Sequence, residues 1–219
     1  MALIEINQNF GESSEYLFLF VLTILVAWIL LVIFSYRTYG YKKTIRFFLP
    51  MILASLFVES AGVAYGRYYY PNYLLYISLV GGSVPIIIAI GWSVNLFLFI
   101  HMGQFFVEKF YKTTNLLQVI LISIVGGGLG ICLDLITDPI AHHNNWWIWN
   151  QSTSGISFYD VPLTNFRGWF IFILYMSVLT LLIDRSRYSE NRKLLISLFS
   201  ISIVGAAILV TQFFFMGSV

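Results

Sequence analysis

The stretch that decides the fold is CLDLITDPIAHHNNWWIWNQSTSGISFYDVPLTNFRGWF, from Cys132 to Phe170. A nearly uncharged apolar run ends here in two acids, Asp134 and Asp138, and tryptophans and a polar loop follow them. A simple membrane anchor has no need of acids, indoles and a polar loop gathered at one membrane boundary. We therefore interpret the rest of the chain as the scaffold that holds this stretch.

The composition is that of a polytopic membrane protein. The chain has 219 residues, of which 59% are hydrophobic and 10% are charged, whereas soluble domains carry about 25% charged residues. We expect an all-α bundle and a single transmembrane domain over residues 1–219. One cysteine excludes a disulfide framework and a cysteine-ligated metal cluster. The net charge of +2 gives no sign of a nucleic-acid partner.

Six apolar runs approach the roughly 20 residues that cross the hydrocarbon core. They are residues 16–34, 45–65, 84–101, 116–137, 169–183 and 194–216. The fifth is short and could begin a turn earlier. Residues 73–80 are apolar but too short to span, which leaves a re-entrant piece, an interfacial piece or a seventh span open. The first fifteen residues contain no Lys or Arg, so we expect the first run to be retained rather than cleaved as a signal peptide.

The basic residues predict the orientation of these spans. Ten of the twelve Lys and Arg residues follow the first, third and fifth runs, and only Arg67 and Arg167 lie on the other side. Basic loops face the cytoplasm. The long loops 66–83 and 139–165 are therefore expected to share the non-cytoplasmic side.

The two long loops resemble each other in sequence. Val84-Pro85 precedes Gly91-Trp92, and a shift of 77 residues places Val161-Pro162 and Gly168-Trp169 at the same spacing. This pattern predicts duplicated units at 45–101 and 116–183, related in parallel, with their acidic ends facing each other. The alternative is chance, because Gly, Pro and Trp are common at the ends of membrane helices.

Several motifs together carry a family resemblance. They are Glu59 with Gly66, Tyr68 and Tyr70; Val84-Pro85 with Trp92; Asp134 with Asp138-Pro139; Trp147 and Trp149; and Tyr159 with Val161-Pro162-Leu163, Asn165-Phe166 and Gly168-Trp169. On these motifs the chain resembles the carotenoid biosynthesis protein family of integral membrane proteins, which includes carotenoid 1,2-hydratases such as bisanhydrobacterioruberin hydratase. The resemblance covers roughly the middle half of the chain. Asp160, where the family often has a small residue, and the pair His142-His143 depart from it.

The resemblance implies hydration of a terminal double bond of a linear carotenoid, without a cofactor or a metal. Its substrate would be a linear carotenoid or another isoprenoid lipid, drawn from the surrounding membrane lipid. Other enzymes of carotenoid biosynthesis are candidate partners. The expected location is the cytoplasmic membrane of a prokaryote.

This chemistry requires a proton donor, a pocket that tolerates a tertiary carbocation, and water. A carboxylic acid buried in an apolar site can stay protonated at neutral pH and act as a general acid. We expect Glu59 or Asp134 to donate the proton, and Asp138 or Asp160 to orient the water. Aromatic faces stabilise a nearby cation by up to about 2 kcal/mol each. The expected substrate-binding residues are Tyr68, Tyr70, Trp92, Trp146, Trp147, Trp149, Tyr159, Asn165, Arg167 and Trp169.

Structural explanations compete with these roles. Asp138 before Pro139 is a common helix start, and Glu59 could form an ion pair with Arg67. Trp and Tyr at a membrane boundary are usually anchors. The Gly126–Gly130 spacing predicts close helix packing. The adjacent histidines His142 and His143 point apart on a helix, so no metal site is predicted there.

Other functions share some of these features. An isoprenoid cyclase would begin with the same protonation and end without water. An intramembrane prenyltransferase would use Asp134 and Asp138 to begin a magnesium-binding motif, but the sequence has no second Asp-rich motif. A protein that binds or transports isoprenoids without catalysis could use the same acidic pocket.

Overall fold

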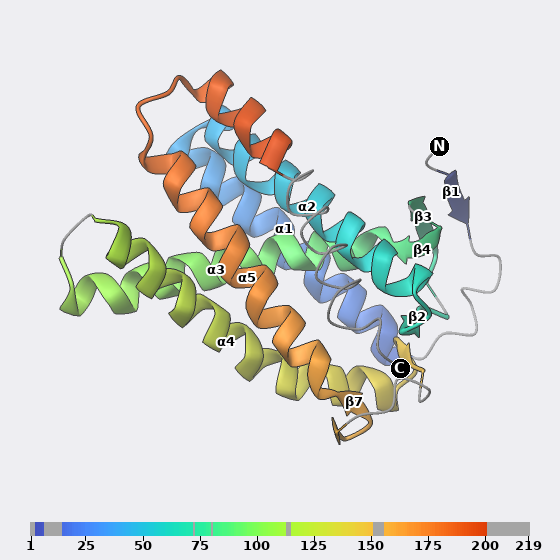
Figure 1. Cartoon of the computed structure of the whole chain (residues 1–219). Coiled ribbons are helices and arrows are strands. Elements are labelled where there is room, and N and C mark those ends of the chain that lie inside the picture. Colours follow the sequence, from blue (N-terminus) through green and yellow to red (C-terminus); the bar gives the residue numbers. More distant parts are fainter. Residues whose placement is uncertain are drawn as a thin grey trace.

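Five long helices make up most of the computed structural model, which describes residues 3–6, 15–71, 73–79, 81–112, 115–150 and 156–200. They are α1 (Glu15–Tyr39), α2 (Tyr41–Ala64), α3 (Ile86–Phe110), α4 (Leu116–His143) and α5 (Leu163–Arg185) (Figure 1). All five are long and apolar enough to cross a membrane. The predicted helical membrane bundle is therefore confirmed. Residues 190–200 are also helical, and the remainder of the predicted sixth span lies outside the described residues.

The structure differs from the expected spans in three places. Helix α5 begins at Leu163, a turn and a half before the predicted start. Helix α4 continues through Pro139 to His143, so Asp138 does not cap the start of a helix. Residues 75–79, within the segment that left a seventh span open, form strand β3 rather than a helix. Tyr76 and Ile77 in this short segment are of the aromatic and β-branched types that are enriched in strands.

Short strands collect at one end of the bundle. Strands β1 (Leu3–Ile6), β3 (Leu75–Leu79) and β4 (Gly82–Pro85) form an antiparallel sheet in the order β1-β3-β4. Strand β2 (Tyr68–Tyr69) pairs with β5 (Ile148–Trp149), and β6 (Ser157–Phe158) pairs with β7 (Val161–Pro162). All of these strands lie at the same end in Figure 1. The β2–β5 pair ties the two long loops together, with Tyr68 opposite Trp149.

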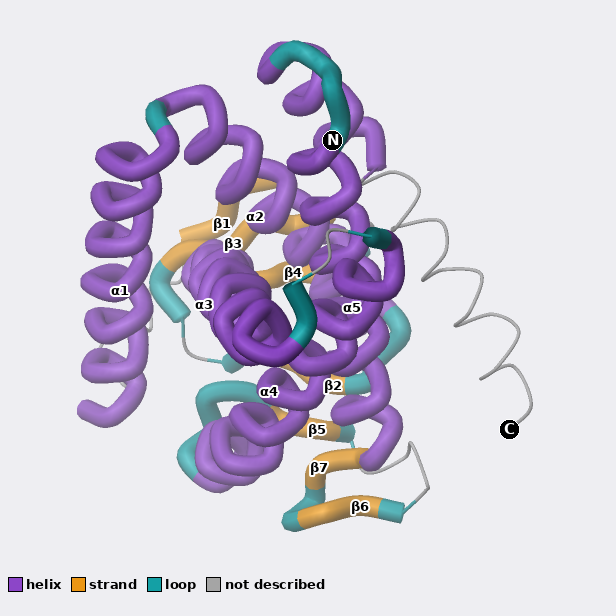
Figure 2. The backbone as a smooth tube through the Cα atoms, turned by 90° about the vertical axis from the view of Figure 1, so that its left-hand side faces the viewer, coloured by secondary structure: helices purple, strands orange, loops and turns teal. Residues whose placement is uncertain are grey.

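Helix α3 runs through the middle of the bundle and α1 lies at its edge (Figure 2). Leu96 and Ile100 of α3 are buried, as are Ile122 of α4 and Ile173 of α5. Only 6% of the apolar window of α1 is buried, and its mean hydropathy is 3.2. A helix so apolar and so exposed is suited to contact with lipid chains.

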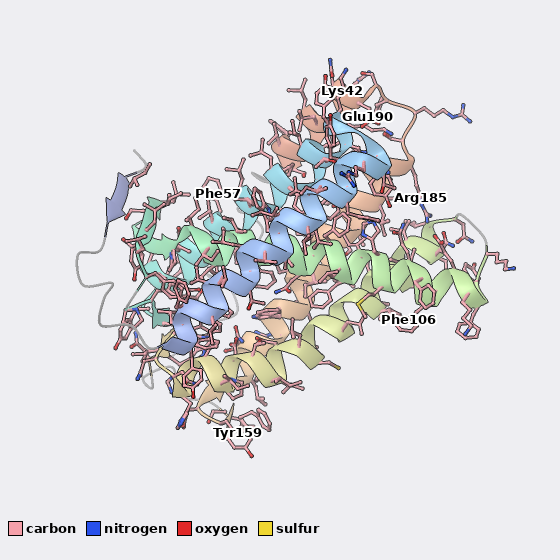
Figure 3. All side chains as sticks on the ribbon, turned by 180° about the vertical axis from the view of Figure 1, so that it is seen from behind. Lys42, Phe57, Phe106, Tyr159, Arg185 and Glu190 are labelled. Carbon is pink, nitrogen blue, oxygen red and sulfur yellow. The ribbon has the colours of Figure 1, made fainter. Side chains whose placement is uncertain are left out.

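Ion pairs occupy the other end of the bundle. Asp184 of α5 accepts hydrogen bonds from Lys43 Nζ at 2.9 Å and from Arg46 at 2.5 Å, and Arg46 also donates to Glu190 at 3.1 Å. Figure 3 shows Lys42, Arg185 and Glu190 at this end, away from Tyr159. The basic connections and the two long loops therefore lie at opposite ends, as the distribution of Lys and Arg predicts.

Glycines set the distance between α3 and α4. A Cβ at Gly103 of α3 would lie 2.6 Å from the carbonyl oxygen of Ile122, and one at Gly126 of α4 would lie 3.2 Å from that of Phe99. A Cβ at Gly128, also on α4, meets nothing within 4 Å. The close helix packing predicted around Gly126 is thus present, as is usual for small residues in membrane bundles.

We expect Gly103→Ala to destabilise the detergent-solubilised protein by about 1–3 kcal/mol, because the new methyl group overpacks against backbone. Thermal unfolding, followed by circular dichroism or by loss of monomeric protein, measures the change. Gly128→Ala is the matched control and should leave the midpoint unchanged or raise it slightly. Equal midpoints for the two variants would contradict this account of α3–α4 packing.

Candidate active site

Glu59 lies on the last turns of α2 and is 7% exposed. One carboxyl oxygen, Oε2, accepts hydrogen bonds from the hydroxyls of Tyr68 and Tyr70, each at 2.6 Å. The other, Oε1, accepts one from Trp92 Nε1 at 2.6 Å. An ionised carboxylate is an acceptor-only group, and hydrogen bonds to charged acceptors are the strong ones. This arrangement therefore suits Glu59 as a carboxylate.

The two tyrosines that hold Glu59 are half-buried and lie outside the spans. Burial raises the pKa of Tyr68 and of Tyr70 well above the usual value of 10.0, and the nearby negative charge of Glu59 raises both further. Both hydroxyls consequently keep their protons at neutral pH and stay hydrogen-bond donors. Strand β2, which carries Tyr68, is held in place by β5.

Asp134 and Asp138 form a second acidic group, on one face of α4. They are four residues apart, so they are neighbours on the helix surface, and their exposures are 0% and 2%. Asn165 Nδ2 of α5 donates to Oδ2 of Asp134 at 2.9 Å and to Oδ2 of Asp138 at 2.6 Å.

The two aspartate carboxyl groups lie close together, because Asn165 Nδ2 donates to both of them. Two ionised carboxylates that share one buried site repel each other, which favours one proton on the pair. Asp134 Oδ1 is buried without a hydrogen-bond partner among the described residues. An unpaired oxygen costs less free energy on a neutral carboxyl group than on an ionised one. The proton is therefore best placed on Asp134.

A cavity of about 50 Å³ separates the two acidic groups. Glu59 and Asp138 both line it, together with Asn165. The remaining walls are aromatic or apolar side chains: Tyr68, Tyr70, Ile88, Trp92, Trp147, Trp149 and Trp169. The volume exceeds the roughly 10–15 Å³ that a single water needs, and polar partners are present. The cavity can hold water beside two carboxyl groups.

Two indoles from different halves of the chain meet at this cavity. The rings of Trp92 and Trp169 have centroids 4.2 Å apart. Each tryptophan follows a proline that precedes its helix, and Pro85 and Pro162 have nearly the same backbone angles, with φ −62° in both and ψ of 129° and 136°. The matching geometry supports the internal duplication, which stays a prediction.

Other residues expected at the site lie outside the cavity wall. Tyr159 is 74% exposed, and Asp160, in the turn between β6 and β7, and Arg167 are exposed as well. Trp146 stacks on Phe20 of α1, with ring centroids 4.6 Å apart. Asp134 lies behind Asp138. The structure thus brings Glu59, Asp138, Asn165 and most of the expected aromatic residues together, and leaves the β6–β7 turn apart.

Two features of the site were not predicted from the sequence. Ile88 lines the cavity, and its position four residues before Trp92, on the same helix face, was an available signal. No sequence pattern predicts the contact of Phe20 with Trp146, because it joins segments far apart in the sequence. Within the described ranges, no group of three His, Cys, Asp or Glu side chains is arranged to hold a metal ion.

Comparison with known proteins gives one match. The family model described as carotenoid biosynthesis protein matches residues 19–219, so the chain belongs to that family and has a role in carotenoid biosynthesis. No curated protein and no solved structure matched the chain.

The tyrosine donors predict a loss of stability at alkaline pH. The folded-state pKa of Tyr68 and of Tyr70 lies above the unfolded value of about 10. The stability that depends on their protons is therefore present below pH 10 and falls above it, by up to about 1.4 kcal/mol per pH unit for each tyrosine. Unfolding midpoints in detergent between pH 9 and pH 11 measure this slope. The Tyr68→Phe/Tyr70→Phe double variant should show a shallower slope, and Tyr159→Phe the wild-type slope. A double variant as steep as wild type would contradict the prediction.

Proposed function

We propose that this member of the carotenoid biosynthesis protein family hydrates a terminal double bond of a linear carotenoid by acid catalysis, without a cofactor. The observation that carries this proposal is the arrangement of two acidic groups across a cavity lined by aromatic rings. Asn165 bridges Asp134 and Asp138 on one side, and three donors hold Glu59 on the other.

Asp138 is the proton donor to the substrate, because it lines the cavity whereas Asp134 lies behind it. Asp134 passes its proton to the neighbouring carboxyl group of Asp138. The π electrons of the terminal double bond take this proton, a C–H bond forms, and the more substituted carbon becomes a tertiary carbocation. A positioned general acid contributes about 10²–10⁴ in rate. This assignment replaces Glu59 as a donor, because both Glu59 oxygens accept hydrogen bonds.

The cation then lies in a site prepared for positive charge. The carboxylate of Glu59 faces it from α2, with a charge held in place by three donors. Fixed charges and dipoles aimed at a developing charge are usually the largest single contribution to catalysis. The indole faces of Trp92, Trp147 and Trp169 contribute up to about 2 kcal/mol each when water is excluded.

Water completes the reaction. A water molecule in the cavity adds to the carbocation, a C–O bond forms, and the proton it loses returns to the Asp134–Asp138 pair. The sum is one C=C bond and one H₂O converted to C–H and C–OH, with the acid restored. Asn165 keeps both aspartates oriented through the cycle. The volume of about 50 Å³ suits water, so the walls must move apart to admit the end of the polyene from the bilayer.

The same proposal includes the orientation in the membrane. The end that carries the active site faces away from the cytoplasm, because the basic connections at the other end mark the cytoplasmic side.

The test is expression in a host that accumulates an acyclic carotenoid, with mass spectrometry of the extracted pigment. Wild type should give a product heavier by one water. Asp138→Asn should lower the yield by about 10²–10⁴-fold, with Asp134→Asn and Glu59→Gln also strongly impaired. Glu108→Gln, at an exposed position near the other end of α3, is the matched control and should behave as wild type.

Other results in this experiment would indicate a different function. An isomer of unchanged mass would indicate a cyclase, which uses the same protonation but loses a proton instead of adding water. Unchanged pigment despite good membrane expression would favour binding or transport of the isoprenoid. Full activity in Asp138→Asn would exclude the acid proposed here.

A further inference from the structure

A second and larger cavity lies at the basic end of the bundle. Its volume is about 230 Å³, and its walls come from α1, α2, α3, α5 and the helical residues 190–200. Nothing in the proposed hydration of the terminal double bond uses it. The chemistry of its walls indicates which other molecule it fits.

The walls of this cavity are charged at one end and apolar at the other. Lys43 and Asp184 line the charged end, and Met51 of α2 and Met176 of α5 line the apolar end. Each methionine lies eight residues from the charged side chain on its own helix, which is about 12 Å at 1.5 Å per residue. Phe97 of α3 adds an aromatic ring to the apolar part. A cavity of this kind suits an amphipathic molecule with a polar head and an apolar body.

The charged end has more cations than carboxylates. Asp184 pairs with both Lys43 and Arg46. Glu190 pairs with both Arg46 and Lys193. Three cations thus share two carboxylates, and the side chains of Arg46 and Lys193 are only 4% and 10% exposed. A buried positive charge without a counter-charge is costly, so an anion bound in the cavity stabilises this end of the bundle.

The two cations that line the cavity keep hydrogen-bond donors for a ligand. Among the described residues, the side chain of Lys43 donates one hydrogen bond and that of Arg46 donates two, whereas an ammonium group has three donors and a guanidinium group has five. Lys43 also lies in the first turn of α2, which contains no acidic side chain, and the helix dipole favours an anion there. Phosphate oxygens accept hydrogen bonds from both kinds of side chain.

The surroundings of the cavity favour a phosphate group that is carried by a lipid. This end of the bundle has ten of the twelve Lys and Arg residues and only three acids, Glu108, Asp184 and Glu190. Basic clusters beside a membrane attract anionic lipids. A free phosphate ion would leave the apolar wall in contact with water, whereas the glycerol backbone and first methylene groups of a lipid cover it.

We propose that this second cavity binds the headgroup of an anionic membrane phospholipid, with its phosphate held by Lys43 and Arg46 and its glycerol backbone against the apolar wall. Gln104 and Thr180 also line the cavity, and their side chains can donate hydrogen bonds to the ester carbonyl groups of the lipid. The site is independent of the proposed hydration, because the two cavities share no lining residue. The bound lipid would join α2, α3 and α5 at the end of the bundle that is remote from the active site.

Lipid retention by the purified protein tests the proposal. Native mass spectrometry from micelles that contain phosphatidylglycerol and phosphatidylcholine should show preferential retention of phosphatidylglycerol. Lys43→Gln should lower this retention about fivefold or more, which is the effect of one basic side chain beside an anionic lipid. Lys42→Gln removes the same charge at the adjacent, exposed position outside the cavity wall (Figure 3), and it should retain the lipid as wild type does. Equal losses in the two variants, or no loss in either, would overturn the proposal.

Two further variants separate binding in the cavity from binding on the surface. Thr180→Phe fills the cavity without a change of charge and should lower retention several-fold, whereas Leu182→Phe, which adds a ring at an exposed position on the same helix, should not. Asp184→Asn removes an acid from the charged end, so added phosphatidylglycerol should raise its unfolding midpoint by more than it raises that of wild type. Wild-type retention by Thr180→Phe would place the lipid on the surface and refute the cavity site. Displacement of the lipid by inorganic phosphate would indicate a site for free phosphate and refute the lipid as its ligand.

Discussion

The structure depends on one constraint: carboxyl groups buried at the end of a membrane bundle must be satisfied there, because an unpaired buried charge is prohibitive. Glu59 meets this requirement with three hydrogen-bond donors, and Asp134 and Asp138 share the amide of Asn165. The proposed mechanism assigns these carboxyl groups different protonation states on either side of one small cavity. A difference of this kind between neighbouring acids is how active sites divide the roles of acid and counter-charge.

The short strand β2 positions the tyrosine hydroxyls that donate to Glu59. Tyr68 lies in strand β2 and Tyr70 follows it directly, between helices α2 and α3. The β2–β5 pair and the hydrogen bond from Asn150 to the carbonyl of Gly66 at 2.5 Å fix one loop against the other. The opposite end of the bundle solves its charge problem with ion pairs instead, because Lys43, Arg46 and Asp184 meet there. Helix α3 reaches from one end to the other.

The spans and their order could be predicted from hydropathy, because a long apolar run in a bilayer must satisfy its backbone hydrogen bonds as a helix. The gathering of Glu59, Asp138, Trp92 and Trp169 followed from the motif pattern, since acids inside apolar runs rarely lack partners. The hydrogen-bond partners of these acids could not be predicted from the sequence. Arg67 stood out in the sequence as a counter-ion for Glu59, yet two tyrosines and an indole hold it. Hydrogen bonding of this kind depends on the path of a loop, and strand β3 shows how poorly composition alone predicts that path in a short apolar segment.

The distribution of hydrogen-bond partners between the two halves of the chain bears on how the protein is made. Glu59 and its three donors all lie between α2 and α3, and Asp134, Asp138 and Asn165 all lie between α4 and α5. Each pair of helices therefore leaves the ribosome with the groups that neutralise its own buried acids. The first pair can enter the bilayer as a satisfied hairpin before the second has been synthesised, and neither has to wait for the other to cover a bare carboxylate. Assembly of the two hairpins afterwards adds the β2–β5 hydrogen bonds and close packing, with the glycine contacts of α3 and α4 guiding the fit.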